Sequence, residues 1–427
     1  MISIQSWQLI SDFSVFNPRR GKFCYDVPMK PCAACGAVPV NHTTEWLSAL
    51  LDTLLYPLVW PFEMISRAVL PLFMKLPLRY FEFPLARLLA WIGMLEFLRE
   101  PDTKDSLRTK AIWESAAKRG ISLFEFRLFG KPESNFFLAR FGKEVRIFDG
   151  LPRPEHVPPA SLDWLDDKAS IIPRFKKAKI PVARGERCFT LGQAKRVLET
   201  IGPPLVVKPH VGSRSRHTTA YITNETELQH AFRIAKQLSP WAVVEEQLAG
   251  SVFRVTLIGG RVAGVLRRDP PLVLGNGKNT IRELIEAENK NPLRTGPIFH
   301  SLLVDTAAMS KIQTQGFSWS SVPKKGTSVI LRDSLSRKTG GTTTDVTDSV
   351  HPENISLFEH AADVLNDSVV GIDFMIGDME KSWRRQKRCG VIECNSLPFL
   401  DLHHYPFRGR ARDVSGMLWE LVFPSIK

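Results

Sequence analysis

Two apolar stretches near the C-terminal end of the chain carry polar residues within them. SVVGIDFMIGD contains Asp373, and GVIECNSLPFL, at residues 390–400, contains Glu393 and Asn395. Short runs rich in Val, Ile and Phe predict buried strands, which an exposed basic loop joins here. Because side chains alternate across a strand, Glu393 and Asn395 point to the same face. The pattern predicts two neighbouring antiparallel strands that present oxygen atoms from an apolar background.

Helical and strand patterns follow one another from Lys104 onward. AIWESAAKRG predicts a helix that ends at Gly120, and the alternating apolar residues after it predict strands. The Pro-rich residues 151–161 predict a linker. LDDKASIIPRFKKAKIPVARG and TLGQAKRVLETIG predict helices, the second of them closed by Gly202, and PLVVKPHVG and WAVVEEQLAG predict buried strands. The order indicates an α/β fold.

Residues 46–98 form a strongly apolar and aromatic segment that is broken by charges and prolines. No uncharged run reaches the roughly 18 to 20 residues that a membrane-spanning helix needs. Prolines at positions 57, 61, 71, 77 and 84 would interrupt any long helix, so the segment predicts short amphipathic helices. Their apolar side either lies on a membrane surface or packs against the rest of the protein or a second subunit. Both interpretations stay open at this point.

Composition and charge narrow the class of protein. The chain has 427 residues, of which 44% are hydrophobic and 24% charged, and this indicates a globular protein with two or three domains. A net charge of +13 suits nucleic acid, an anionic membrane or phosphorylated small molecules. The basic residues follow neither a recognition-helix pattern nor an aromatic-interleaved sheet pattern, so no nucleic-acid partner is expected.

The cysteines and the N-terminus bear on the compartment. Six cysteines without the spacing of a disulfide framework indicate reduced thiols and a cytoplasmic setting. The N-terminus shows no signal-peptide pattern, so export is not expected. Cys32 and Cys35 form a CxxC, and Cys24 and His42 would complete a four-ligand zinc set. Free thiols are the alternative, which the irregular spacing favours.

The two acids in apolar strands need a neutralising partner, because a buried lone carboxylate is costly. An arginine elsewhere in the fold is one candidate. A hard divalent cation is the other, since Mg²⁺ prefers oxygen ligands and binds to carboxylates together with substrate phosphates. Strands lie about 4.8 Å apart, so Asp373, Glu393 and Asn395 would converge on one or two ions.

Basic residues and glycine loops offer places for the phosphates. Lys208 ends an apolar strand, where a desolvated ammonium needs an anion, and Lys168 follows Asp167 before a helix. GSRSRH, which begins at Gly212, is a short basic loop that would cover phosphates. KTGGTTTDVTD is a second candidate loop, in which Thr339 offers a hydroxyl and Gly340 and Gly341 allow close approach.

Together, these motifs resemble the ATP-grasp superfamily of carboxylate–amine ligases. The resemblance rests on Lys168, Lys208, the hinge-like VVEEQLAG and the trio Asp373, Glu393 and Asn395. Further segments resemble the ATP-grasp domain of cyanophycin synthetase and of bifunctional glutathione synthetases, namely GNGKNTIRELIEAENKNPLR, QGFSWSSVPKKGTSVILR, TGGTTTDVTDSVHPEN and GVIECNSLPFLDLHHYPFRGRARDV. The similarity runs from about residue 160 to 424 and more faintly back to 105, while residues 1–104 match nothing in the family.

The resemblance implies a role for each matching position. Lys168, Lys208 and the loop at Gly212 would bind ATP phosphates, and the backbone from Glu245 and Glu246 to Leu248 would hold the adenine. Arg268 and Arg332 would steady phosphate or acyl-phosphate charge. The trio of Asp373, Glu393 and Asn395 would hold Mg²⁺, for which Mn²⁺ is a substitute. The implied reaction activates a carboxylate as an acyl phosphate, which an amine then attacks.

Several positions depart from the family pattern. After Lys208 only Gly212 remains of a glycine-rich loop, and Val252 stands where an acid usually meets the ribose. Asp401 replaces an arginine of cyanophycin synthetase, and His403, which matches a family histidine, suits a structural role equally well. The glycine-poor loop and Val252 motivate an alternative function, a degenerate nucleotide-binding module that acts as a membrane-associated scaffold or regulator.

The predicted fold class is α/β, an ATP-grasp fold whose two α+β lobes hold ATP between them. The predicted organisation is an extension at 1–104, an α/β segment at 105–160 and an ATP-grasp domain at 161–427, with an ATP-binding lobe at about 185–255 and a metal and substrate lobe at about 256–424. Expected partners are ATP, a small carboxylate and an amine, with a membrane surface or partner protein at 46–98 and self-association as further options. The expected location is the cytoplasm or the inner face of a membrane.

Overall fold

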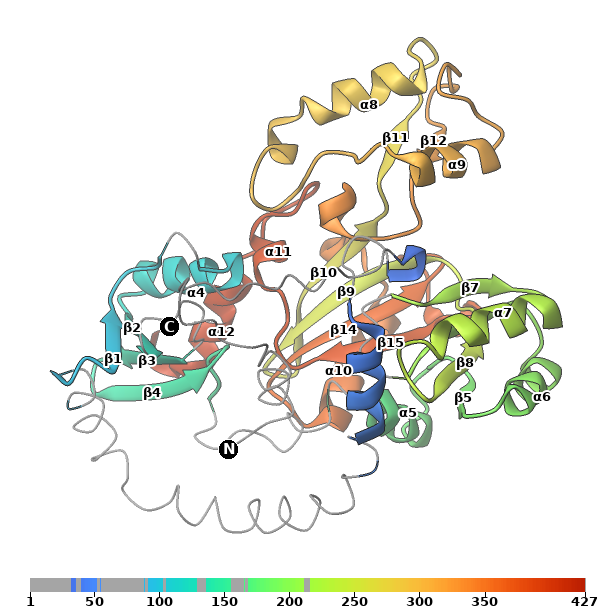
Figure 1. Ribbon diagram of the computed structural model, residues 1–427. Helices are drawn as coiled ribbons and strands as arrows, with labels where there is room; N and C mark the ends of the chain where they lie inside the picture. The colour runs from blue at the N-terminus through green and yellow to red at the C-terminus, as the bar shows by residue number, and fades with distance from the viewer. Residues whose placement is uncertain are drawn as a thin grey trace, which may run out of the picture. The chain divides into compact units, whose positions relative to one another are not determined.

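A computed structural model gives the fold of the protein (Figure 1). It describes residues 32–35, 40–51, 54, 88, 91–102, 105–128, 136–154, 165, 168–210 and 216–426. The chain divides into two compact units, the first of which joins Ala183–Leu248 to the described part of Met1–Leu76. The second consists of Pro77–Val182 and Ala249–Lys427. Each unit is built around its own sheets.

The first unit contains a four-stranded antiparallel sheet with two helices. Its strand order is β5 (Gly185–Cys188), β8 (Ala242–Glu246), β6 (Leu205–Pro209) and β7 (Thr219–Ile222), and its helices are α6 (Leu191–Ile201) and α7 (Glu225–Ala235). Thr190 and Gln193 form a capping box at the start of α6, and Gly202, with φ of 77°, ends it. The helix closed by Gly202 and the two buried strands are therefore confirmed.

The same unit includes the described residues near the N-terminus. Ala33–Cys35 form a short 3₁₀ helix, and residues 42–51 form an α-helix. Most of the apolar segment 46–98, and with it the predicted amphipathic helices, lies outside the described residues. Within the described part of the chain, no helix combines the length and apolarity that crossing a bilayer requires.

The second unit begins with an antiparallel sheet of four strands in chain order. They are β1 (Leu95–Leu98), β2 (Ser122–Leu128), β3 (Phe136–Phe141) and β4 (Glu144–Asp149), packed with α4 (Leu107–Lys118) and α12 (Val414–Val422). The helix predicted to end at Gly120 and the strands after it are confirmed. The prediction of a helix at Leu95–Leu98 was wrong. These residues form an edge strand that pairs with β2. The indole of Trp419 donates a hydrogen bond to the Ile112 carbonyl at 3.1 Å.

A five-stranded antiparallel sheet forms the centre of the second unit. Its order is β13 (Thr342–Asp345), β10 (Arg261–Asp269), β9 (Ser251–Ile258), β14 (Val369–Ile376) and β15 (Gly390–Asn395). Alternate residues of β9 and β14, including Val255 and Phe374, pack on α10 (Pro352–Leu365) and α5 (Lys168–Lys177) in one apolar core. The intervening residues therefore point to the opposite face. The two predicted neighbouring antiparallel strands are confirmed as β14 and β15.

Two smaller parts complete the second unit (Figure 1). One has its own apolar core and consists of an antiparallel pair of strands and two helices, β11 (Leu272–Leu274), β12 (Ser328–Ile330), α8 (Ile281–Asn289) and α9 (Thr306–Thr314). The other is the short helix α11 (Asp401–His404), which follows β15. The mixed helices and antiparallel sheets agree with the predicted α/β class with α+β lobes.

Candidate active site

Strand pairing brings the two acids and an arginine onto one face of the five-stranded sheet. Asp373 of β14 lies opposite Arg254 of β9 on one side and opposite Glu393 of β15 on the other. Directly paired residues share a face, and Asn395, two residues after Glu393, shares it as well. This face is the one turned away from the apolar core. The polar face, as we call it, thus carries Arg254, Asp373, Glu393 and Asn395.

The buried carboxylate of Asp373 has the arginine partner that was one of its two predicted candidates. Asp373 is 2% exposed, and Arg254 bonds it through two nitrogens, with Nη2 2.9 Å from Oδ2. Arg268 adds a third contact, from Nη1 to Oδ2 at 3.3 Å. Burial alone would raise the pKa of Asp373, but the charge and hydrogen bonds of Arg254 and the charge of Arg268 hold it below its usual value. Asp373 is therefore a charged, bidentate-bound carboxylate.

The donor set also fits a hard cation. Asp373 and Glu393 lie directly opposite one another on neighbouring strands, so the two carboxylates repel, and a dication relieves that repulsion. Among the described residues, the buried Nδ2 of Asn395 has no hydrogen-bond partner. Its amide oxygen and nitrogen can therefore exchange places without the loss of a hydrogen bond from this nitrogen. Asp373, Glu393 and Asn395 together offer the oxygen ligands that Mg²⁺ prefers.

His403 covers the same polar face from α11. Its Nε2 lies 2.8 Å from the Oγ1 of Thr256, and a Cβ on Gly264 would come within 2.5 Å of its Nδ1. Only glycine at position 264 leaves room for the imidazole. Burial, aided by the charge of Arg254, lowers the pKa of His403 to about 3. The side chain is therefore neutral at physiological pH and fixed against the sheet.

We expect His403 to make the stability of the protein depend on acid. A histidine with a lowered folded pKa stabilises the fold fully above its unfolded pKa, and this contribution is lost as the pH falls toward about 3. Between pH 7 and pH 5 the loss is about 2 kcal/mol for an unfolded pKa of about 6.5. Urea unfolding at both pH values should show a smaller loss for His403→Gln than for the wild type. An equal loss in both proteins would contradict this assignment.

The predicted loop with Thr339, Gly340 and Gly341 is a tight turn in the second unit. The Thr339 hydroxyl donates to the Ser336 carbonyl at 3.0 Å, and Gly340 has φ of 100°. A Cβ on Gly340 would lie 2.8 Å from the Leu302 side chain, and one on Gly341 would lie 2.8 Å from the Leu335 carbonyl oxygen. Both glycines are therefore required by packing within the protein.

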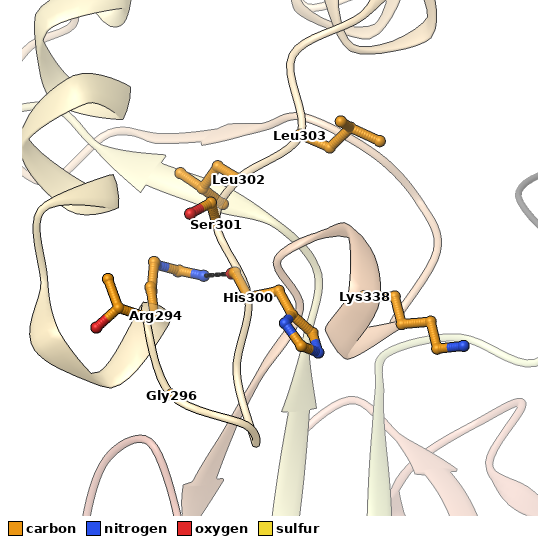
Figure 2. Close-up of a pocket in the computed structure, with 8 residues that line it drawn as sticks. Arg294, Gly296, His300, Ser301, Leu302, Leu303 and Lys338 are labelled. Carbon is orange, nitrogen blue, oxygen red and sulfur yellow. Dashed lines mark hydrogen bonds between the residues drawn. The ribbon is translucent and has the colours of Figure 1, made fainter.

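An open pocket of about 530 Å³ lies beside this turn (Figure 2). Figure 2 shows the guanidinium of Arg294 directed at the backbone of His300, and a hydrogen bond of 3.1 Å joins them. Arg294 also donates to the Gly340 carbonyl at 2.9 Å. The basic side chain of Lys338 lines the pocket from the turn itself. The pocket is thus lined by cationic groups and fixed to the predicted loop.

The other predicted cation of this unit has a different partner. Arg332 forms an ion pair with Asp305, the residue that caps α9, and its hydrogen bond lowers the pKa of Asp305. The structure thus ties Arg332 to the α9 cap, whereas Arg268 reaches Asp373. Lys168 begins α5, but only its backbone is described, and Gly212 lies outside the described residues.

The predicted nucleotide residues of the first unit lie on neighbouring strands. Lys208 at the end of β6 forms an ion pair with Glu245 of β8. Glu246 binds the guanidinium of Arg184, with Nη2 2.9 Å from Oε2. Leu248 is buried. The ammonium of Lys208 thus has an anionic partner within the protein, so its assignment to ATP phosphate stays a prediction.

Arg254 is the site residue that the sequence reasoning missed. Its partner Asp373 is 119 positions away, so no local spacing connects the two. A signal was present, because a single arginine interrupts the apolar strand SVFRVTLI. A buried arginine in such a strand requires an acid nearby, just as Asp373 required a cation.

Comparisons with known proteins identify relatives of this region. No protein-family model matches the chain. Cyanophycin synthetase of Trichormus variabilis is 32% identical over 324 residues, which make up 74% of this chain and 35% of that protein. The glutathione biosynthesis bifunctional protein of Clostridium perfringens is 27% identical, over 74% of this chain and 41% of that protein. The chain thus spans little more than a third of the length of these relatives.

The fold is shared with a solved structure. A bifunctional glutathione synthetase from Pasteurella multocida superposes with a TM-score of 0.61, at 23% sequence identity, over 75% of this chain and 44% of that one. This likeness shows that the two proteins share a fold. The chain therefore carries an ATP-grasp domain related to those of cyanophycin synthetase and bifunctional glutathione synthetase.

Proposed function

We propose that the protein is an ATP- and Mg²⁺-dependent ligase that joins a carboxylate to an amine through an acyl phosphate. The observation that carries the proposal is the polar face, where Asp373 and Glu393 lie opposite one another beside the guanidinium groups of Arg254 and Arg268. Each of these charges is costly to bury, so a sheet with only a structural role would be more stable with apolar residues at these positions.

The residues of the polar face would bind the metal ion, stabilise negative charge and orient one another. Asp373, Glu393 and Asn395 would hold Mg²⁺, which when bound neutralises phosphate oxygens and stabilises charge in phosphoryl transfer. Arg268 contacts Asp373 on the same polar face and would stabilise the negative charge of the phosphoryl group during transfer. Arg254 keeps Asp373 charged and oriented, which makes Arg254 a positioning residue.

The reaction then balances in two steps. A carboxylate oxygen of the acid substrate attacks the γ-phosphorus of ATP, the bond to the β-phosphate oxygen breaks, and ADP leaves. The amine attacks the carbonyl carbon of the acyl phosphate, loses a proton, and expels phosphate that retains the original carboxylate oxygen. No protein nucleophile is needed, so catalysis rests on positioning and electrostatic stabilisation.

The substrate class is an amino acid or a peptide-like acid. The names of the relatives, cyanophycin synthetase and a glutathione biosynthesis protein, support this class. Asp401 supports a substrate different from that of cyanophycin synthetase, because it reverses the charge expected there. It is buried, and its Oδ2 lies 3.5 Å from Nη1 of Arg337.

Phosphate release tests the proposal. Purified full-length protein is supplied with ATP, with Mg²⁺ or with a chelator, and with pools of amino acids, small peptides and other carboxylates. We expect release that requires Mg²⁺ and at least one pool. Absence of release with every pool, together with only weak ATP binding by calorimetry, would favour the degenerate nucleotide-binding module.

Lys208 is expected to be required for nucleotide binding, whereas its partner acid is not. Lys208→Met should weaken ATP binding by about 10- to 100-fold, because a charged hydrogen bond to phosphate is lost. Glu245→Gln is the matched control, since only the backbone at Glu245 is assigned to the adenine. Calorimetric titration of both variants measures the difference. Equal losses in both variants would mean that the ion pair has only a structural role.

A further inference from the structure

Four potential metal ligands meet in the first unit, three of them close together near the N-terminus and the fourth distant in sequence. They are Cys32, Cys35, His42 and His217, and their ligand atoms all lie within 4.8 Å of one another. The Sγ of Cys35 is 3.1 Å from Nε2 of His42 and 3.3 Å from Nε2 of His217. Cys32 places its Sγ 3.6 Å from the same His217 nitrogen. Two sulfurs and two imidazole nitrogens thus converge on one point.

These separations match the edges of a zinc tetrahedron. Zinc binds Cys sulfur at about 2.3 Å and His nitrogen at about 2.0 Å, so neighbouring ligand atoms are roughly 3.5 Å apart. Two thiolates and two neutral imidazoles also cancel the charge of Zn²⁺, which suits a partly buried site. A tetrahedral set of two sulfurs and two nitrogens favours zinc over magnesium or calcium, which prefer oxygen.

The outer contacts of the cluster orient its ligands. His217 is buried, and its Nδ1 lies 2.8 Å from the Ile234 carbonyl oxygen, so Nδ1 carries the proton and Nε2 presents its lone pair to the cluster. The backbone N–H of Cys35 donates to the Cys32 carbonyl at 3.1 Å, which closes the CxxC turn. Both features are typical of structural zinc sites.

His217 also holds a backbone conformation that needs a reason. Its φ of 51° is left-handed, and its N–H donates to the Ala34 carbonyl at 2.9 Å. A residue other than glycine is uncommon in this conformation, and constraints from its surroundings help to hold it there. Binding of the side chain to a metal supplies such a constraint, together with the edge contact at 4.7 Å between the His42 and His217 rings.

We propose that Cys32, Cys35, His42 and His217 bind one structural zinc ion, which fastens the N-terminal segment to the turn before β7. The ion would connect Cys32 and Cys35 to His217, which follows them by more than 180 positions. It would thereby attach the N-terminal segment to the sheet that carries Lys208. The zinc set suggested by the sequence contained Cys24 as its fourth ligand, whereas the structure places His217 beside Cys32, Cys35 and His42. Cys24 lies outside the described residues.

Metal content tests the proposal independently of any enzymatic activity. Full-length protein without a polyhistidine tag is purified under reducing conditions and reconstituted with zinc, and the bound metal is measured by mass spectrometry. We expect one zinc per chain in the wild type and loss of stoichiometric zinc in His217→Gln. Substituted cobalt should give the absorption of a tetrahedral site with thiolate ligands, which that variant loses.

Matched variants separate a site from a folding defect. His42→Gln, at the start of the helix 42–51, should also lose zinc, and it keeps the test informative if a change at buried His217 disrupts folding. His230→Gln, an exposed histidine of α7, and Cys24→Ser should each retain one zinc. A chelator should lower the melting temperature of the wild type but not that of His42→Gln. Zinc-free wild type after reconstitution, a Cys32–Cys35 disulfide, or full zinc in the His42 and His217 variants would overturn the proposal.

Discussion

Replacement of Glu393 with glutamine is expected to reduce substrate-dependent phosphate release by about 100-fold or more. Glutamine keeps the size of the side chain, but it removes one of the two carboxylates that would hold Mg²⁺. It also leaves Asp373 with both of its arginine contacts, so the fold should persist. The measurement is the rate of ADP formation at saturating ATP and Mg²⁺.

A control variant and a metal titration make this result specific. Glu380→Gln changes an exposed acid in the loop between the same two strands and should leave the rate unchanged. In the Glu393 variant, the remaining activity should require a higher Mg²⁺ concentration than in the wild type. Full activity of the Glu393 variant at ordinary Mg²⁺ concentrations would remove this residue from the site.

Loss of Arg254 is expected to have the largest effect on stability. Arg254→Met leaves the buried carboxylate of Asp373 with Arg268 alone, whose nitrogen lies 3.3 Å away. Removing one partner of a buried ion pair typically costs about 3–5 kcal/mol, because the other charge stays desolvated. Urea unfolding of the variant and the wild type measures the change in the free energy of unfolding.

Two further variants test the cause of this loss. The double variant Arg254→Met with Asp373→Asn removes both charges, so it should recover a large part of the stability. Arg261→Met removes an exposed guanidinium, 83% accessible and 3.5 Å from Glu359, and should cost less than about 1 kcal/mol. Similar losses for Arg254→Met and Arg261→Met would contradict the role given to the buried pair.

The sequence was sufficient where a local pattern carried the information. Short runs rich in Val, Ile and Phe predicted β14 and β15, and the polar residues within them led to the pair of Asp373 and Glu393. The capped helix ending at Gly202 was predicted for the same reason, since its capping box and glycine lie within a few residues. In both cases the residues that decide the structure are close together in the chain.

Long-range partners were beyond such reasoning. Arg254 lies more than a hundred positions from Asp373, and His217 lies as far from Cys35, so only the folded chain brings these pairs together. The strand at Leu95–Leu98 was read as part of a helical segment because its pairing partner, β2, decides its conformation. Tertiary pairing outweighed local preference in that case.

Transfer of oxygen from the substrate tests the central claim most directly. The protein is incubated with ATP, Mg²⁺ and an amino-acid pool whose carboxyl groups carry ¹⁸O, and the phosphate released is analysed by mass spectrometry. An acyl-phosphate route predicts one ¹⁸O atom in each phosphate, because the carboxylate oxygen that attacked the γ-phosphorus leaves with it. Phosphate that forms in a substrate-dependent manner but carries oxygen only from ATP and water would contradict the ligase account.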